Sequence, residues 1–126
     1  MIQYQEIGFV AYPVTDIPRA RKFYEGVLGL KPNAPLKSEN QPWIEYDIGP
    51  GTLGIGCSSQ WLPSQDGPSV ALEVVDFEAA IATLREHKVA FIIGPMETPI
   101  CHMATLRDPD GNKLTIHRRK KGQAFF

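Results

Sequence analysis

Three side chains in this sequence could carry acid–base chemistry: Glu45, Glu73 and His117. Each lies in a stretch where apolar and polar residues alternate, so each belongs to one face of an extended strand. Two carboxylates and an imidazole that meet in a cavity would form an acid–base site or a displaced metal site. The simpler interpretation places them at the rim of a sheet, where the carboxylates pair with Lys or Arg.

The composition is that of an ordinary globular protein. The chain has 126 residues, of which 43% are hydrophobic and 21% are charged, so it can bury a core of its own. There are 13 Lys and Arg residues against 14 Asp and Glu residues, and this balance argues against nucleic-acid binding. No apolar run approaches the ~20 residues that a membrane-spanning helix needs, which argues against a membrane partner.

The N-terminal segment and the spacing of the cysteines predict the cellular location and the redox state of the thiols. The segment Met1–Glu6 lacks the basic and apolar regions of a secretory signal, so we expect a cytoplasmic protein. Cys57 and Cys101 form no CxxC or zinc pattern and are expected to be reduced, packed thiols.

An internal repeat with an offset of 60 residues organises the chain. Residues 9–20 align with residues 69–80, and Val, Ala, Val, Asp and Ala recur at matching places. One such duplication predicts two similar modules. In each module an alternating strand leads into an amphipathic helix, for which Asp16 and Asp76 are the expected N-cap residues.

Further strands and turns are expected after each helix. Alternating or short apolar runs predict strands at 43–48, 52–57, 89–93, 103–106 and 113–117. Each module is interpreted as strand–helix–strand–strand–strand, although in the first module the runs identify two of its three later strands, at 43–48 and 52–57. The basic run Arg118–Lys121 is interpreted as a solvated tail.

Two short motifs accompany these modules. The first helix carries Arg21–Tyr24 and ends with Val27–Leu30, and a tight turn of sequence Asp-Pro-Asp-Gly-Asn covers 108–112. With these features the chain resembles the vicinal oxygen chelate superfamily, which includes glyoxalase I, bleomycin-resistance proteins and extradiol dioxygenases. The resemblance implies an α+β fold. In it, two tandem βαβββ modules form an open, cup-shaped, mostly antiparallel eight-stranded sheet with helices on the convex face.

The resemblance covers nearly the whole chain and implies a single glyoxalase/bleomycin-resistance-like domain over residues 1–126. Its expected parts are a first module at about 1–57, a linker at 58–68, a second module at about 69–118 and a basic tail at 119–126.

The resemblance also implies where a metal would bind. Metal-using relatives hold a divalent ion with His, Glu or Gln at four strand positions, which fall here on Phe9, Gly54, Ser69 and Thr115. Phe and Gly offer no ligand atom, and hydroxyls are poor ligands beside imidazole and carboxylate. We therefore expect no metal and no cofactor.

The same cup is the expected ligand site, because concave and mostly apolar cavities bind small molecules. The expected ligand-binding residues are the aromatic Phe9 and Trp43, the glycines Gly54 and Gly56, which would leave volume, and the hydroxyls of Ser69, Thr105 and Thr115. In the alternative interpretation Phe9 fills the space of the metal and closes the core. Trp61 in the linker either covers the mouth of the cup or anchors its own loop.

The leading functional hypothesis is metal-independent binding of a small organic molecule, planar or aromatic, in the manner of bleomycin-resistance proteins. A lyase, an isomerase or a dioxygenase-like enzyme with a displaced metal or acid–base site is the first alternative. A non-catalytic dimerisation module is the second. The expected partners are a small organic ligand and a second copy of the chain in a homodimer.

Overall fold

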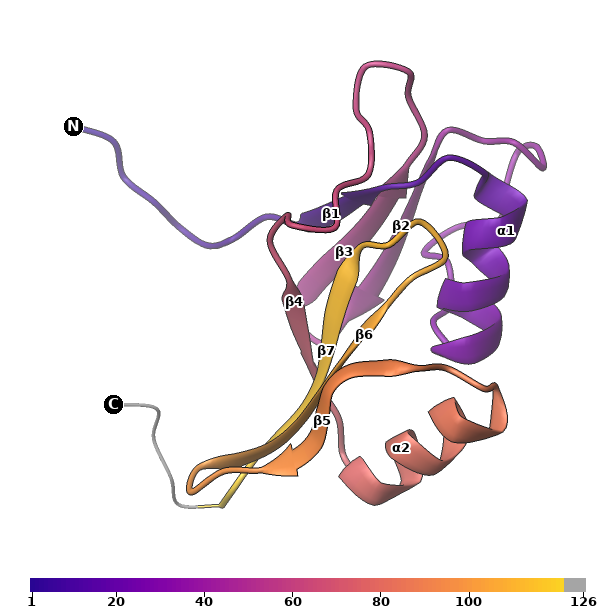
Figure 1. Cartoon of the computed structure of the whole chain (residues 1–126). Helices are drawn as coiled ribbons and strands as arrows, with labels where there is room; N and C mark the ends of the chain where they lie inside the picture. The colour runs from indigo at the N-terminus through magenta and orange to yellow at the C-terminus, as the bar shows by residue number, and fades with distance from the viewer. Residues whose placement is uncertain (122–126) are drawn as a thin grey trace. The chain divides into compact units, whose positions relative to one another are not determined.

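The computed structural model describes residues 1–121 and divides the chain into two compact units, Met1–Pro63 and Ser64–Phe126. Each unit contains one helical segment and one sheet, with one strand before the helical segment and the other strands after it (Figure 1). In chain order the elements are β1 (Val10–Pro13), α1 (Ile17–Arg21), η1 (Lys22–Val27), β2 (Trp43–Ile48), β3 (Gly51–Gly56), β4 (Val70–Glu73), α2 (Phe77–Glu86), β5 (Phe91–Glu97), β6 (Cys101–Arg107) and β7 (Lys113–Arg119).

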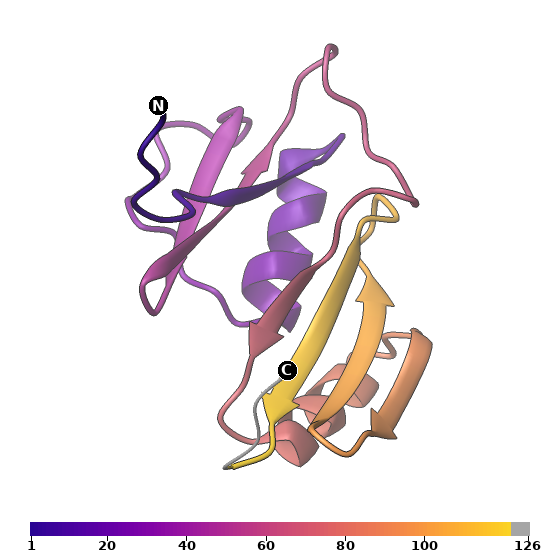
Figure 2. The ribbon, with the colours of Figure 1, turned by 90° about the vertical axis from the view of Figure 1, so that its left-hand side faces the viewer.

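The first unit has a three-stranded sheet in the order β1-β3-β2. Strand β3 pairs with β1 in parallel and with β2 in antiparallel fashion. The helical segment α1–η1 covers one face of this sheet (Figure 2). Tyr24 of η1, Tyr46 of β2 and Ile55 of β3 are fully buried on that side. Because side chains alternate along a strand, the side chains of Glu45 and Asp47, next to Tyr46, point to the opposite face.

The second unit has a four-stranded sheet in the order β4-β7-β6-β5. Strand β4 pairs with β7 in parallel, and the other neighbouring strands are antiparallel. Helix α2 lies against one face of this sheet (Figure 2). Its buried residues are Phe77, Ile81 and Leu84. The predicted α+β class is therefore confirmed, with open and mostly antiparallel sheets.

Both predicted helix starts are confirmed. The Asp16 carboxylate accepts a hydrogen bond of 2.9 Å from Arg19 N–H, and the Asp76 carboxylate accepts one of 3.0 Å from Ala79 N–H. A carboxylate there satisfies an N–H group that has no partner within the helix. At the other end of the first helix, Gly29 has a φ of 74°, the left-handed conformation that suits the residue after a helix.

The number of strands differs from the resemblance. Residues 1–121 contain seven strands rather than eight, because no strand forms between η1 and β2. That segment carries Pro32, Pro35 and Pro42, and proline has no N–H to donate to a sheet. The expected fourth strand of the first module is thus replaced by an irregular loop.

The turn between β6 and β7 and the segment expected as the linker connect these elements. In the turn between β6 and β7, the buried Asp108 accepts hydrogen bonds of 2.9 Å from the N–H groups of Asp110 and Asn112. The predicted linker 58–68 holds a single short bridge between Ser58 and Trp61. Of the expected basic tail 119–126, Arg119 ends β7, and residues 122–126 lie outside the described residues.

Candidate functional site

The first unit presents aromatic rings on the sheet face that its helix leaves uncovered. Strand β2 buries Ile44 and Tyr46 toward the helix and therefore turns Trp43 and Glu45 to the other face. We use the name aromatic platform for Phe9, Trp43 and Trp61, which contact one another or the same glycines there.

Trp43 lies directly over two glycines of β3. A Cβ atom on Gly54 would be 2.7 Å from Cζ2 and Cη2 of Trp43, and a Cβ atom on Gly56 would be 2.9 Å from Trp43 Cε3. Both distances are too short for a real side chain, so glycine is what lets the indole lie on the backbone. The sequence hypothesis expected these glycines to leave empty volume. That part was wrong, because the indole fills it.

Two more rings border the indole. Phe9 meets Trp43 edge to face, with ring centroids 5.6 Å apart and an interplanar angle of 77°. Trp61 approaches the same glycine from the linker, since a Cβ atom on Gly56 would be 2.9 Å from Trp61 Cζ3. Phe9 and Trp61 remain 56% and 37% exposed, so the platform keeps apolar surface available for contact. Sequence reasoning did not assign Trp61 to the site, and a lone linker tryptophan gives no periodic signal.

Glu45 is joined to the platform by a hydrogen bond. Trp43 Nε1–H donates to Glu45 Oε2 at 2.8 Å, and Glu45 pairs in register with Gly54. The bond fixes the direction of the indole along the strand, so Glu45 has a positioning role.

In the second unit, the three predicted hydroxyl residues form one row across the sheet. Thr105 Oγ1 lies 2.9 Å from Thr115 Oγ1, which lies 3.4 Å from Ser69 Oγ. Thr105 is buried, whereas Ser69 is exposed. The row can donate to and accept from a polar group at its Ser69 end.

Glu73 and His117 come together beside this row. His117 Nδ1 lies 2.5 Å from Glu73 Oε1, and Glu73 Oε2 accepts a hydrogen bond of 2.7 Å from Arg119 N–H. Burial by itself raises the pKa of Glu73, but the hydrogen bonds from Arg119 and His117 outweigh it and hold this pKa below its ordinary value. The carboxylate is therefore kept ionised. Of the three predicted acid–base residues, the structure pairs Glu73 with His117 and Glu45 with Trp43.

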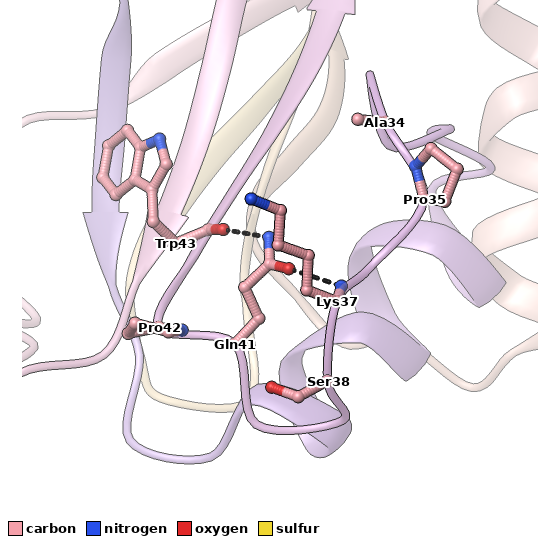
Figure 3. Close-up of a pocket in the computed structure, with 7 residues that line it drawn as sticks. All are labelled: Ala34, Pro35, Lys37, Ser38, Gln41, Pro42 and Trp43. Carbon is pink, nitrogen blue, oxygen red and sulfur yellow. Dashed lines mark hydrogen bonds between the residues drawn. The ribbon is translucent and has the colours of Figure 1, made fainter.

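A surface cavity of about 450 Å³ lies on the other side of the Trp43 backbone. Its lining residues are Ala34, Pro35, Lys37, Ser38, Gln41, Pro42 and Trp43 (Figure 3). Gln41 accepts from Lys37 N–H and donates to the carbonyl of Trp43, both at 2.8 Å, while the indole points away from the cavity (Figure 3). Sequence reasoning missed this cavity, for which the proline-rich composition of the loop was the one available signal.

The comparison with protein families matches residues 6–116 to the model named Glyoxalase/Bleomycin resistance protein/Dioxygenase superfamily. The chain belongs to this superfamily. The resemblance that the sequence suggested is thereby confirmed. Among curated proteins, none matches the sequence significantly.

Solved structures of the superfamily share the fold. A glyoxalase/bleomycin resistance protein from Streptomyces sp. CB03234 is 25% identical, with a TM-score of 0.73, over 90% of this chain and 100% of that one. TnmS3, an antibiotic binding protein from the same organism, is 24% identical, with a TM-score of 0.77, over 95% and 100% of the two chains. A glyoxalase/dioxygenase from Nostoc punctiforme is 18% identical, with a TM-score of 0.76, over 93% and 92%.

The residues present do not fit the metal centre that the resemblance implies. Gly54 has no side chain and is covered by the Trp43 indole, and Phe9 contacts the same ring. The hydroxyls of Ser69 and Thr115 are hydrogen bonded to each other. Within residues 1–121, no group of three or more His, Cys, Asp or Glu side chains is arranged to hold a metal ion.

The helices of residues 1–121 are also too short to serve as apolar membrane spans.

Proposed function

We propose that this member of the superfamily binds a planar aromatic small molecule on the aromatic platform without a metal ion. The observation that carries the proposal is the Trp43 indole lying over Gly54, with exposed Phe9 and Trp61 beside it. A flat ligand can stack on or against such rings, and each aromatic pair contributes about 0.5–1.5 kcal/mol beyond the burial of apolar area.

Membership of the superfamily supports a small-molecule ligand in general terms. One solved protein with this fold, TnmS3, is described as an antibiotic binding protein, which agrees with a binding role for the fold. The aromatic character of the ligand rests on the platform alone. We further propose the hydroxyl row of Ser69, Thr105 and Thr115 as a polar contact surface of the second unit.

Metal independence is supported by the replacement of ligand-bearing residues with Phe9 and Gly54, whose space is occupied by aromatic contacts. A binding function then depends on shape and stacking rather than on coordination. Elemental analysis of the purified protein tests this part by itself, and a stoichiometric divalent metal would overturn it.

Titration of tryptophan fluorescence tests the binding. The chain has two tryptophans, and both belong to the platform, so their emission reports on this surface. Three-ring probes such as 9-aminoacridine and anthracene-9-carboxylate are expected to quench the emission in a saturable manner. Cyclohexanecarboxylate, which has no π face, serves as the negative control. Absence of saturation with every aromatic probe would overturn the proposal.

A second candidate function is acid–base catalysis, and the pairing of Glu73 with His117 favours it. A carboxylate that is kept ionised can hold an imidazole in one orientation, which acid–base chemistry requires. Expected evidence would be a reaction with a small substrate that is lost in His117→Gln while probe binding to the platform is retained.

A further inference from the structure

We infer that the platform selects planar aromatic cations, with Glu45 as the residue that determines the charge preference. The inference rests on the proposed function, because it concerns the same surface. Its starting observation is that the carboxylate closest to the indole is hydrogen bonded to it, at 2.8 Å from Trp43 Nε1.

The Glu45 carboxylate has bonding capacity left. Its Oε2 accepts the indole N–H, and Oε1 has no hydrogen-bond partner within residues 1–121. The side chain is half-buried, and Glu45 faces Gly54 in the strand register. A ligand that stacks on the indole therefore brings its rim to an unoccupied carboxylate oxygen. An N–H⁺ group on that rim gains a charge-assisted hydrogen bond, whereas an anionic group is repelled.

The rest of the sheet adds no positive charge. The charged residues of β1, β2 and β3 are Glu45 and Asp47, and alternation places both on the platform face. The basic Arg19 and Arg21 belong to α1, which packs on the opposite face, and Arg21 is paired there with Glu25. Aromatic faces also attract cations through their quadrupole. Ring faces and carboxylate thus favour the same sign of ligand charge.

The test compares two flat three-ring probes of opposite charge, the cation 9-aminoacridine and the anion anthracene-9-carboxylate, by fluorescence titration at neutral pH. The cation is expected to bind about tenfold more tightly to the wild-type protein. In Glu45→Gln its affinity is expected to fall about five- to tenfold, with the anion unchanged or tighter. Gln keeps an acceptor for the indole N–H, so the variant removes the charge and retains the ring position.

The matched control is Asp47→Asn, which removes an equal charge from the same face of the same strand. Asp47 is exposed and bonded to Asn33 and Thr52, so its loss is expected to change cation affinity by no more than about twofold. Circular dichroism establishes that both variants fold. If Glu45→Gln does not fold, the ratio of cation to anion affinity in the wild type, and its decrease with added salt, decide the question.

The possible outcomes separate the two proposals. Equal affinities for the two probes, or equal effects of Glu45→Gln and Asp47→Asn, would overturn the charge preference and leave the aromatic platform standing. Failure of both probes to bind would overturn the proposed function itself.

Discussion

The phenol of Tyr46 donates a hydrogen bond of 2.9 Å to Glu25 Oε2, across 21 residues of sequence. Arg21 binds the same carboxylate through two donors, Nε at 2.7 Å and Nη2 at 2.9 Å. Tyr46 is fully buried on the helix side of β2, the strand that also carries Trp43 of the platform. The network therefore ties the helical segment to the strand that carries Trp43 and Glu45.

Replacing Tyr46 by Phe removes one donor to Glu25 and keeps the ring. We expect the free energy of unfolding to fall by about 1–2 kcal/mol, since the carboxylate loses a partly buried hydrogen bond. Urea denaturation measures the change. Tyr4→Phe is the control, because Tyr4 is 88% exposed and its replacement is expected to change nothing. Equal stability of the two variants would show that the Tyr46–Glu25 bond contributes nothing.

The same network predicts sensitivity to acid. Burial by itself raises the pKa of Glu25, but the hydrogen bonds from Arg21 and Tyr46 and the charge of Arg21 bring it below the ordinary value. A lowered pKa in the folded state contributes stability above the unfolded value, about 4.3, and this stability is lost as pH falls through the folded pKa. Thermal unfolding at pH 7 and pH 3 is expected to show a larger loss for wild type than for Glu25→Gln. Identical losses would contradict the argument.

Gly54→Ala tests the contact between backbone and indole. Its Cβ atom would lie 2.7 Å from the Trp43 ring, so the ring must move, and we expect a loss of about 1–3 kcal/mol and a shift in tryptophan emission. Gly26→Ala is the matched control, since a Cβ atom there meets nothing within 4 Å. Its stability is expected to equal that of wild type or exceed it slightly. Unchanged emission in Gly54→Ala would refute the close approach.

Trp61→Ala tests the contribution of the linker ring to binding. We expect affinity for 9-aminoacridine to fall about three- to tenfold through the lost aromatic contact, with the fold retained. Leu62→Ala next to it is the control, because Leu62 is 69% exposed and is not part of the platform. Equal affinities of the two variants would remove Trp61 from the proposed site.

Metal removal gives a further prediction. Dialysis against EDTA is expected to leave the affinity for 9-aminoacridine unchanged, since the proposed site holds its ligand by stacking and charge. Re-addition of Zn²⁺ or Mn²⁺ is likewise expected to have no effect. A loss of binding on chelation, restored by one of these ions, would contradict metal independence.

Local features were predictable from the sequence. Asp16 and Asp76 cap their helices, and the Asp108–Asn112 turn folds as expected, because each depends on bonds within a few residues. Alternation along residues 43–48 is equally local, and it is enough to put Trp43 and Glu45 on the face opposite Tyr46.

Only the tertiary structure decided which of these side chains meet. The contact of Trp43 with Gly54 depends on the register of β2 against β3, and the contact of Glu73 with His117 spans 44 residues and depends on parallel pairing of β4 with β7. The structure also overturned the fourth strand of the first module that the resemblance implies, because the proline-rich segment between η1 and β2 forms no strand. Alternation determines the face of a strand, but the partner across the sheet is set by long-range register, which no local pattern encodes.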